Sequence, residues 1–300
     1  MTSPTRTAYG GQAVIEGVLI RGQHCATVAV RRPDGTIALR SDAINPWFNG
    51  RLRKIPLTRG VLALVESLTL GMRALIYSTN VGMEAEGEEI GKGAVAGVLT
   101  LSVLFSVVLF FIIPVVASEA LGGALGDSDI LSNLAEGVIR LAIFLGYIVL
   151  IGQLGQIRRV FMYHGAEHMT VHAQEHLQPL EVESVRGYST AHPRCGTAFL
   201  LFVVVLAIFV FTLVGRDPIW WLISSRVVLV PFIAAIGYEA IRFSWSHMEN
   251  PLVRMIASPS LALQSLTTRQ PDDAQIEIAI AAMKHALEGD QDPPSRGEMS

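Results

Sequence analysis

The chain has 300 residues, of which 51% are hydrophobic and 16% are charged. Soluble domains carry about 25% charged residues, so this composition, with a mean hydropathy of +0.44, argues against a purely soluble protein and against disorder. The net charge is −3, and nucleic-acid binding would need a concentrated basic face. Two cysteines, Cys25 and Cys195, are too few for a disulfide framework.

Residues 1–55 are predicted to form a small β-rich region. Segments 13–21 and 26–32 alternate between apolar and polar residues and are rich in β-branched ones, and a Pro-Asp-Gly turn signal follows at 33–35. Gly10 and Gly11 indicate a tight turn or a close approach of the backbone. The first twelve residues have no apolar segment, so we expect no cleavable signal peptide.

Residues 56–92 are predicted to form an amphipathic, interfacial helix and an acidic linker. Pro56 suits the first turn of a helix, and Arg59, Glu66 and Arg73 recur every seven residues on one face. The helix would lie in the membrane interface or pack against the spans. A fifth full span is the less favoured alternative.

Residues 93–243 are predicted to form a membrane domain, because about 20 apolar residues suffice to cross a bilayer core. Four apolar runs occupy 93–118, 141–157 (extended back to 134), 196–215 and 219–243. The connection 119–137 has no Lys or Arg, whereas the loop 158–195 has four arginines. The positive-inside rule therefore places this loop and both termini in the cytoplasm.

Arg226 lies inside the fourth predicted span, where a charge is costly and is usually paired or functional. Its candidate partners are Glu136, Arg140 and, less well placed in depth, Glu239. The alternative is that Arg226 reaches the outer interface. Glu239 and Arg242 lie one turn apart and would either form an ion pair or face a metal site.

Residues 244–289 are predicted to form a cytoplasmic C-terminal region. The segment AQIEIAIAAMKHALE follows Pro271-Asp272-Asp273 and has the pattern of a capped amphipathic helix. Residues 290–300 are expected to be a disordered tail.

Four histidines recur every fourth residue after the second predicted span, at positions 164, 168, 172 and 176. This spacing places them along one face of a helix. No proline interrupts the chain before Pro179, so we expect this helix to continue the span into the cytoplasm. His172 and His176 are expected to be solvated or hydrogen-bonded rather than metal ligands.

The segment His164-Gly-Ala-Glu167-His168 has the H-x-x-E-H order, in which two imidazoles bind one metal ion and the glutamate acts as general base. His192 and Cys195 lie in HPRC, directly before the third predicted span. Both ends of the loop 158–195 meet the membrane on the same side. We therefore expect a divalent metal, most favourably zinc, held by His164 and His168 with His192, Cys195 or both.

Five segments resemble the YqhQ-like family of bacterial membrane proteins, also called DUF1385. The resemblance extends from about residue 9 to 287 and is carried by GGQAVIEGVLIRG (10–22), YHGAEHMTVHAQEH (163–176), HPRCGTAFL (192–200), GYEAIR (237–242) and TTRQPDDAQIEIAIAA (267–282). It implies a multi-pass protein of the bacterial inner membrane and a metal-dependent enzyme, but no particular reaction. The matching site residues are Glu16, His164, Glu167, His168, His192, Arg194, Cys195 and Glu239.

Three functions are compatible with these features. The first is a membrane-embedded, metal-dependent hydrolase at the cytoplasmic face, with Glu167 as the base and a membrane peptide or lipid headgroup as substrate. Its third ligand remains open among His192, Cys195, Glu175 and Glu183. A site closed by both His192 and Cys195 would be structural, which is the second possibility: a non-enzymatic assembly or scaffold protein.

A metal transporter is the weakest hypothesis, because apart from Arg226 the spans offer few ligands at mid-depth. The expected partners are the lipid bilayer and a membrane protein or lipid substrate, with no nucleic acid. The sequence leaves the oligomeric state open.

Overall fold

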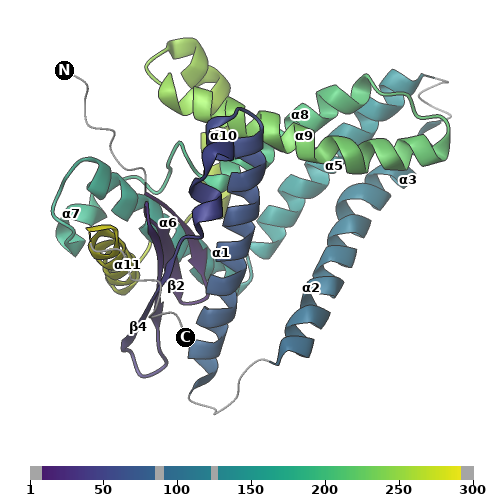
Figure 1. Cartoon of the computed structure of the whole chain (residues 1–300). Coiled ribbons are helices and arrows are strands. Elements are labelled where there is room, and N and C mark those ends of the chain that lie inside the picture. The colour runs from purple at the N-terminus through teal and green to yellow at the C-terminus, as the bar shows by residue number, and fades with distance from the viewer. Residues whose placement is uncertain (1–8, 85–90, 123–127, 292–300) are drawn as a thin grey trace.

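The computed structural model describes residues 9–84, 91–122 and 128–291. The fold is mainly helical, with one small sheet at the N-terminal end of the chain (Figure 1). The strands are β1 (Gly10–Val14), β2 (Gly17–Arg21), β3 (Cys25–Arg31) and β4 (Ile37–Ala43). Two 3₁₀ turns follow, η1 (Pro46–Asn49) and η2 (Arg51–Lys54).

The predicted β-rich region is an antiparallel meander with the strand order β1-β2-β3-β4. Successive side chains along each strand point to opposite faces of the sheet, so an apolar strand contributes residues to both faces. Leu19 and Val28 pack with helix α1 (Thr58–Met83) on one face. Val18 and Ile20 pack on the other face with α6 (Gly155–Glu175) and α11 (Asp273–Gln291). Helices therefore cover both faces of the sheet (Figure 1).

Helix α1 occupies most of the segment predicted to be an interfacial helix. Its C-terminal half packs on the sheet through Ala74 and Val81, and near its N-terminus Gly60 lies against Ala235 of helix α9. The opposite face exposes apolar residues such as Val65. The helix thus packs on the sheet as well as on a predicted span. Most of the predicted acidic linker, 85–90, lies outside the described residues.

Within the described residues, four helices are long and apolar enough to cross a membrane: Thr58–Met83, Gly93–Ala120, Asp129–Ile151 and Trp220–Ser246. The second comprises α2 (Lys92–Val107), the π-helical segment η4 (Val108–Ile112) and α3 (Ile113–Ala120). The other two correspond to α5 (Asp129–Ile151) and α9 (Ile219–Ser246). These helices are compatible with a multi-pass membrane protein.

The set of long apolar helices differs from the predicted spans in one member. The predicted third span forms α8 (Gly196–Thr212), which is apolar but only 17 residues long. Helix α1 takes its place among the four longer candidates. From the sequence, a span at this position is the less favoured alternative, because the segment carries Arg59, Glu66 and Arg73.

The predicted continuous helix from the second span into the histidine segment is wrong. Helix α5 ends at Ile151, three residues form a turn, and α6 starts at Gly155. The backbone of Leu154 is extended there, and Gly152 and Gly155 flank the turn. Glycine is a poor helix former, so the chain breaks at this point and α6 leaves α5 to pack beneath the sheet.

The loop 158–195 also contains the short helix α7 (Val182–Arg186), and the C-terminal region contains α10 (Pro251–Thr267). The predicted C-terminal helix is present as α11, and it extends to Gln291. Asp290, placed in the predicted tail, accepts hydrogen bonds from the backbone N–H groups of Gln23 and His24, at 2.7 Å each. The rest of the predicted tail, 292–300, lies outside the described residues.

Candidate metal centre at the junction of the sheet and the apolar helices

Two motif glycines bring α6 close to its neighbours. A Cβ atom on Gly165 would lie 2.2 Å from the carbonyl oxygen of Arg269, and one on Gly11 would lie 2.8 Å from Cγ of Glu167. Any larger residue at either position would push α6 away from strand β1 or from the segment after α10. The glycines therefore set the position of the histidines and of Glu167.

Three of the predicted ligands converge. One nitrogen each of His164 and His168 and the sulfur of Cys195 all lie within 4.8 Å of one another. His164 Nε2 is 3.2 Å from Cys195 Sγ. Cys195 is the N-cap of α8, and its sulfur accepts a hydrogen bond from the backbone N–H of Thr197 at 3.4 Å. We call these three residues the His-Cys cluster.

Backbone carbonyls fix the orientation of both imidazoles. Nδ1 of His164 donates to the carbonyl of Thr267 at 2.9 Å, and Nδ1 of His168 donates to that of Thr190 at 2.6 Å. A carbonyl only accepts hydrogen bonds, so Nδ1 carries the proton and, in the neutral ring, Nε2 carries a lone pair. Metal-binding histidines are typically oriented in this way by a second partner.

Glu167 lies beside the His-Cys cluster and is only 4% exposed. Its Oε2 is 3.5 Å from Nε2 of His168. With the proton of the neutral imidazole on Nδ1, these two atoms are both hydrogen-bond acceptors. A cation or a donor such as water between them would satisfy both, so this pair is incomplete in the protein alone.

The residues present fit a zinc ion. Imidazole nitrogens and thiolate sulfur are common zinc ligands, and catalytic zinc sites have three protein ligands. Glu167 and the three cluster residues line a cavity of about 50 Å³. A water molecule requires a cavity volume of roughly 10–15 Å³, so this cavity has room for an ion and a small ligand.

His192 does not join the His-Cys cluster. Its ring centroid lies 5.7 Å from that of His168. Its Nε2 is 3.2 Å from Glu175 Oε2, and its Nδ1 accepts a hydrogen bond from the backbone N–H of Arg194 at 3.2 Å. The predicted four-ligand set thus separates into three converging residues and one that belongs to a neighbouring group.

The neighbouring group consists of His172, Glu175 and His192, which also lie close enough together to bind an ion. Arg194 forms an ion pair with Glu175, so a cationic side chain already occupies its carboxylate. Burial lowers the pKa of His172 to about 4, which keeps its ring neutral, and its Nε2 donates to the carbonyl of Ala191 at 2.9 Å. Both ring nitrogens of His192, however, are already used, by Glu175 and by the backbone N–H of Arg194. This group is therefore the weaker metal candidate.

His176 is the last of the four regularly spaced histidines. Its Nδ1 lies 2.7 Å from the carbonyl oxygen of His172, on the exposed surface. The expectation that His172 and His176 are hydrogen-bonded agrees with these contacts.

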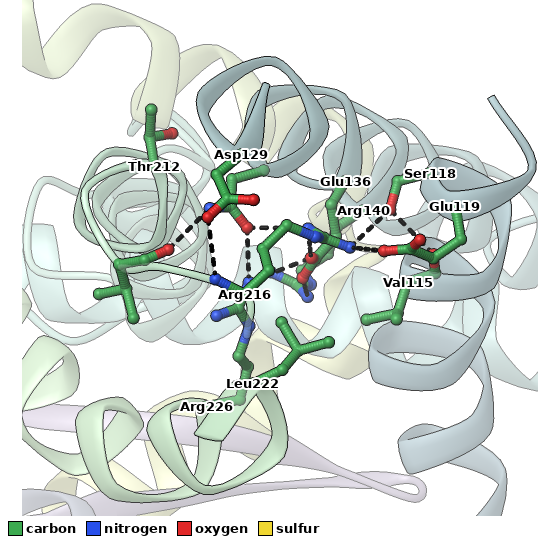
Figure 2. Close-up of polar contacts among 12 residues, drawn as sticks. Val115, Ser118, Glu119, Asp129, Glu136, Arg140, Thr212, Arg216, Leu222 and Arg226 are labelled. Atoms are coloured by element: carbon green, nitrogen blue, oxygen red, sulfur yellow. Dashed lines mark hydrogen bonds and ion pairs between the residues drawn. The ribbon is translucent and has the colours of Figure 1, made fainter. Parts of the chain in front are cut away.

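A second polar group lies at the other end of α5, α8 and α9 (Figure 2). Glu136 is 1% exposed and pairs with three arginines. Its Oε1 accepts from Arg140 at 2.5 Å, and its Oε2 accepts from Arg216 at 2.9 Å and from Arg226 at 3.1 Å. We call these four residues the arginine-glutamate network. Glu136 is thus confirmed as a partner of Arg226, as the sequence predicted.

The side chain of Arg140, on α5, forms a hydrogen bond with the backbone carbonyl of Phe110 in η4. Pro114 has no N–H group to donate to the carbonyl of Phe110, four residues earlier, and the chain is π-helical over this stretch. Arg140 Nε donates to that carbonyl at 2.9 Å. Sequence reasoning missed Arg216, because its position in a short loop carries no signal of burial.

Two of the other family-motif residues tie elements together away from the His-Cys cluster. Glu16, at the β1–β2 turn with φ = 50°, accepts from Arg159 Nε and Nη2 at 2.5 and 2.6 Å. Glu239 pairs with Arg59 of α1 and accepts from the N–H of Leu57 at 3.1 Å. The partner of Glu239 is therefore on α1, rather than the predicted Arg242 or a metal site.

Comparison with known proteins agrees with the resemblance in the sequence. The model of DUF1385, described as a protein of unknown function, matches residues 55–289. An uncharacterized protein of Bacillus subtilis (strain 168), YqhQ, is 35% identical over 295 residues, covering 93% of this chain and 92% of the relative. No solved structure matches the chain significantly.

Proposed function

Because the chain belongs to the DUF1385 family of proteins of unknown function, its activity has to be inferred from the site, and we propose a metal-dependent hydrolase. The enzyme is a multi-pass protein of the bacterial inner membrane that acts at the cytoplasmic face. His164, His168 and Cys195 hold a divalent metal, most favourably zinc, and Glu167 is the general base.

The convergence of three ligand atoms with fixed tautomers carries this proposal. One nitrogen of each histidine and the sulfur lie within 4.8 Å of one another, and both Nδ1–H groups are used by backbone carbonyls. In the neutral ring of His164, the lone pair is therefore on Nε2, which lies 3.2 Å from the sulfur of Cys195.

The number of ligands favours a catalytic site over a structural one. Structural zinc sites have four protein ligands, whereas catalytic sites have three and leave one position for water or substrate. His192, which would close the site, is engaged by Glu175 and by the backbone of Arg194. The alternative of a scaffold protein with a closed metal site is therefore less well supported.

Each residue has a distinct role in this proposal. A divalent metal at such a site polarises the bond to be cleaved and activates water. Glu167, whose Oε2 lies 3.5 Å from His168 Nε2, accepts a proton from the attacking water and returns it to the leaving group. Thr190 and Thr267 hold the two imidazoles in the binding tautomer through their carbonyls.

The first experiment is metal analysis of the protein purified in detergent in the presence of zinc. We expect one zinc per chain in the wild type and a loss of zinc in H168A and C195A. The matched control H192A should keep its zinc, because His192 lies outside the His-Cys cluster. Loss of zinc in H192A as well would indicate a closed, structural site, and a wild type without metal would overturn the proposal.

The second experiment tests the base. Vesicles made from the lipid and membrane-protein extract of the source bacterium are incubated with the zinc-loaded protein, and hydrolysis products are identified by mass spectrometry. Wild-type protein should release products that E167Q does not, although E167Q keeps its zinc and its melting temperature. Equal activity of the two proteins would exclude Glu167 as the base.

A further inference from the structure

A larger cavity opens next to the His-Cys cluster. Its volume is about 520 Å³, within the range of roughly 300–1,000 Å³ typical of small-molecule sites. It lies between β1, β2, α1, α6 and the first turn of α8, and His164, Arg194 and Gly196 line both this cavity and the smaller one. A molecule bound in the larger cavity would therefore touch the edge of the candidate metal centre.

The charged side chains of this cavity are unbalanced. Arg21, Arg53 and Arg194 line it, together with a single carboxylate, Glu66. Glu66 accepts from Arg21 at 2.9 Å and from Arg53 at 2.8 Å, so two guanidinium groups share one carboxylate. The partner of Arg194, Glu175, is not part of the lining. Within the lining, three guanidinium groups therefore accompany one carboxylate, and Arg194 is compensated from outside the lining.

These arginines are not sealed off from the cavity. The side chains of Arg21, Arg53 and Arg194 are 24%, 29% and 18% exposed. Guanidinium groups bind phosphate oxygens with two parallel hydrogen bonds, and a phosphate monoester, with up to two negative charges, suits a lining that has more guanidinium groups than carboxylates. The charged half of the cavity therefore fits a phosphate group.

Part of the remaining wall is apolar, beside the polar Gln12, Ser67 and Thr197. Leu70 of α1 and Val160 and Phe161 of α6 line it. Helix α1 separates this wall from the outside, and its outer face exposes Val65 and other apolar residues of a helix apolar enough to enter a membrane. A ligand with both a phosphate and an apolar portion would match both halves of the cavity.

We propose that the cavity binds an anionic amphiphile that ends in a phosphate monoester, with its phosphate between Arg53 and Arg194 and its apolar chain against Leu70 and Phe161. This inference rests on the proposed function, because the amphiphile is the class of substrate that the cavity would present to the His-Cys cluster. The binding itself needs only the cavity residues and no metal.

The test is isothermal titration calorimetry of the full-length protein in detergent, after removal of metal with a chelator. The probes are dihexanoyl phosphatidic acid, dihexanoyl phosphatidylcholine and inorganic phosphate. We expect saturable binding of the phosphatidic acid, and binding of each of the other two weakened at least about tenfold. Equal binding of inorganic phosphate would show a site for free phosphate, and equal binding of phosphatidylcholine would show general lipid adhesion. Each of these results overturns the proposal.

Variants connect the binding to the cavity. R53Q should weaken binding of phosphatidic acid by about tenfold or more, since a hydrogen bond to a charged group is worth about that factor. The control R158Q removes a charge from an exposed position of α6 outside the cavity lining and should bind normally. A63F fills the cavity without changing its charge and should also weaken binding, which keeps the test valid if R53Q does not fold.

The two proposals fail separately. H168A should lose zinc but still bind phosphatidic acid, and R53Q should lose phosphatidic acid binding but keep zinc. Unchanged affinity in both R53Q and A63F would overturn the assignment of the cavity, whatever the metal content shows.

Discussion

Two polar groups lie at opposite ends of α8, and they differ in how their carboxylates are paired. Cys195, of the His-Cys cluster, is the N-cap of this helix, and Arg216, of the arginine-glutamate network, follows its last turn. Seventeen helical residues separate them by about 25 Å, at 1.5 Å per residue. Both groups lie among apolar helices, where an unpaired polar atom is costly.

In the arginine-glutamate network the carboxylate is fully paired, although Nε of Arg226 has no hydrogen-bond partner among the described residues. Both carboxylate oxygens of Glu136 accept hydrogen bonds from arginines, and Arg216 also pairs with Glu119 at 2.6 Å. In the His-Cys cluster, by contrast, Glu167 and Nε2 of His168 face each other as two acceptors. A buried carboxylate that accepts hydrogen bonds from neighbouring arginines stabilises the fold, whereas two acceptor atoms that face each other can both bind a cation or a water molecule.

The largest expected effect on stability is that of E136Q. The substitution removes the carboxylate that three buried arginines share, and breaking a buried ion pair costs about 3–5 kcal/mol. Thermal unfolding in detergent, followed by tryptophan fluorescence, should show a large drop in the melting temperature. E119Q is the matched control, because the side chain of Glu119 is 62% exposed, and a surface pair is worth about 0–1 kcal/mol. Similar drops in both variants would contradict the contrast between the groups.

An intermediate effect is expected for H168A in the metal-free protein. The variant leaves the carbonyl of Thr190 without its donor, at a cost of about 1–3 kcal/mol. Added zinc should raise the melting temperature of the wild type, because a ligand that binds only the folded state stabilises it. It should have no such effect on H168A. A zinc-induced rise of equal size in both proteins would place the metal elsewhere.

The smallest effect is expected for E16Q. Glu16 and Arg159 are 35% and 48% exposed at their side chains, so the pair contributes about 0.2–1 kcal/mol. The hydrogen bonds from Arg159 lower the pKa of Glu16. The contribution is therefore fully present above the unfolded-state pKa of about 4.3, and it is lost as the pH falls through the lower folded-state pKa. Melting curves of wild type and E16Q should differ slightly at pH 7 and converge in acid. A gap that widens in acid would contradict this assignment.

Local patterns predicted the parts of the fold that depend on nearby residues. The alternation of segments 13–21 and 26–32 corresponds to the antiparallel strands, and the C-terminal amphipathic helix is α11. The break after Ile151 was not predicted, because hydropathy over the apolar run does not reflect the low helix propensity of Gly152 and Gly155.

The candidate site shows the same limit. The four-residue spacing placed His164 and His168 on one helical face, and the spacing alone brought both near one point. It left open whether His192 or Cys195 would join them. That choice depends on the pairing of Glu175 with His192 and Arg194, contacts between the end of α6 and a loop whose path no local pattern describes.

The sequence by itself determined that long apolar helices dominate the chain, that a β-rich segment precedes them, and that the H-x-x-E-H segment is helical. These features follow from hydropathy and periodicity, which act over a few turns. Only the tertiary structure decided that Cys195 faces His164, that α1 covers the sheet, and that three arginines surround Glu136. The hydrogen bond from His164 to Thr267 joins residues 103 positions apart. Such contacts form only when many separate elements pack at once, so no single segment encodes them.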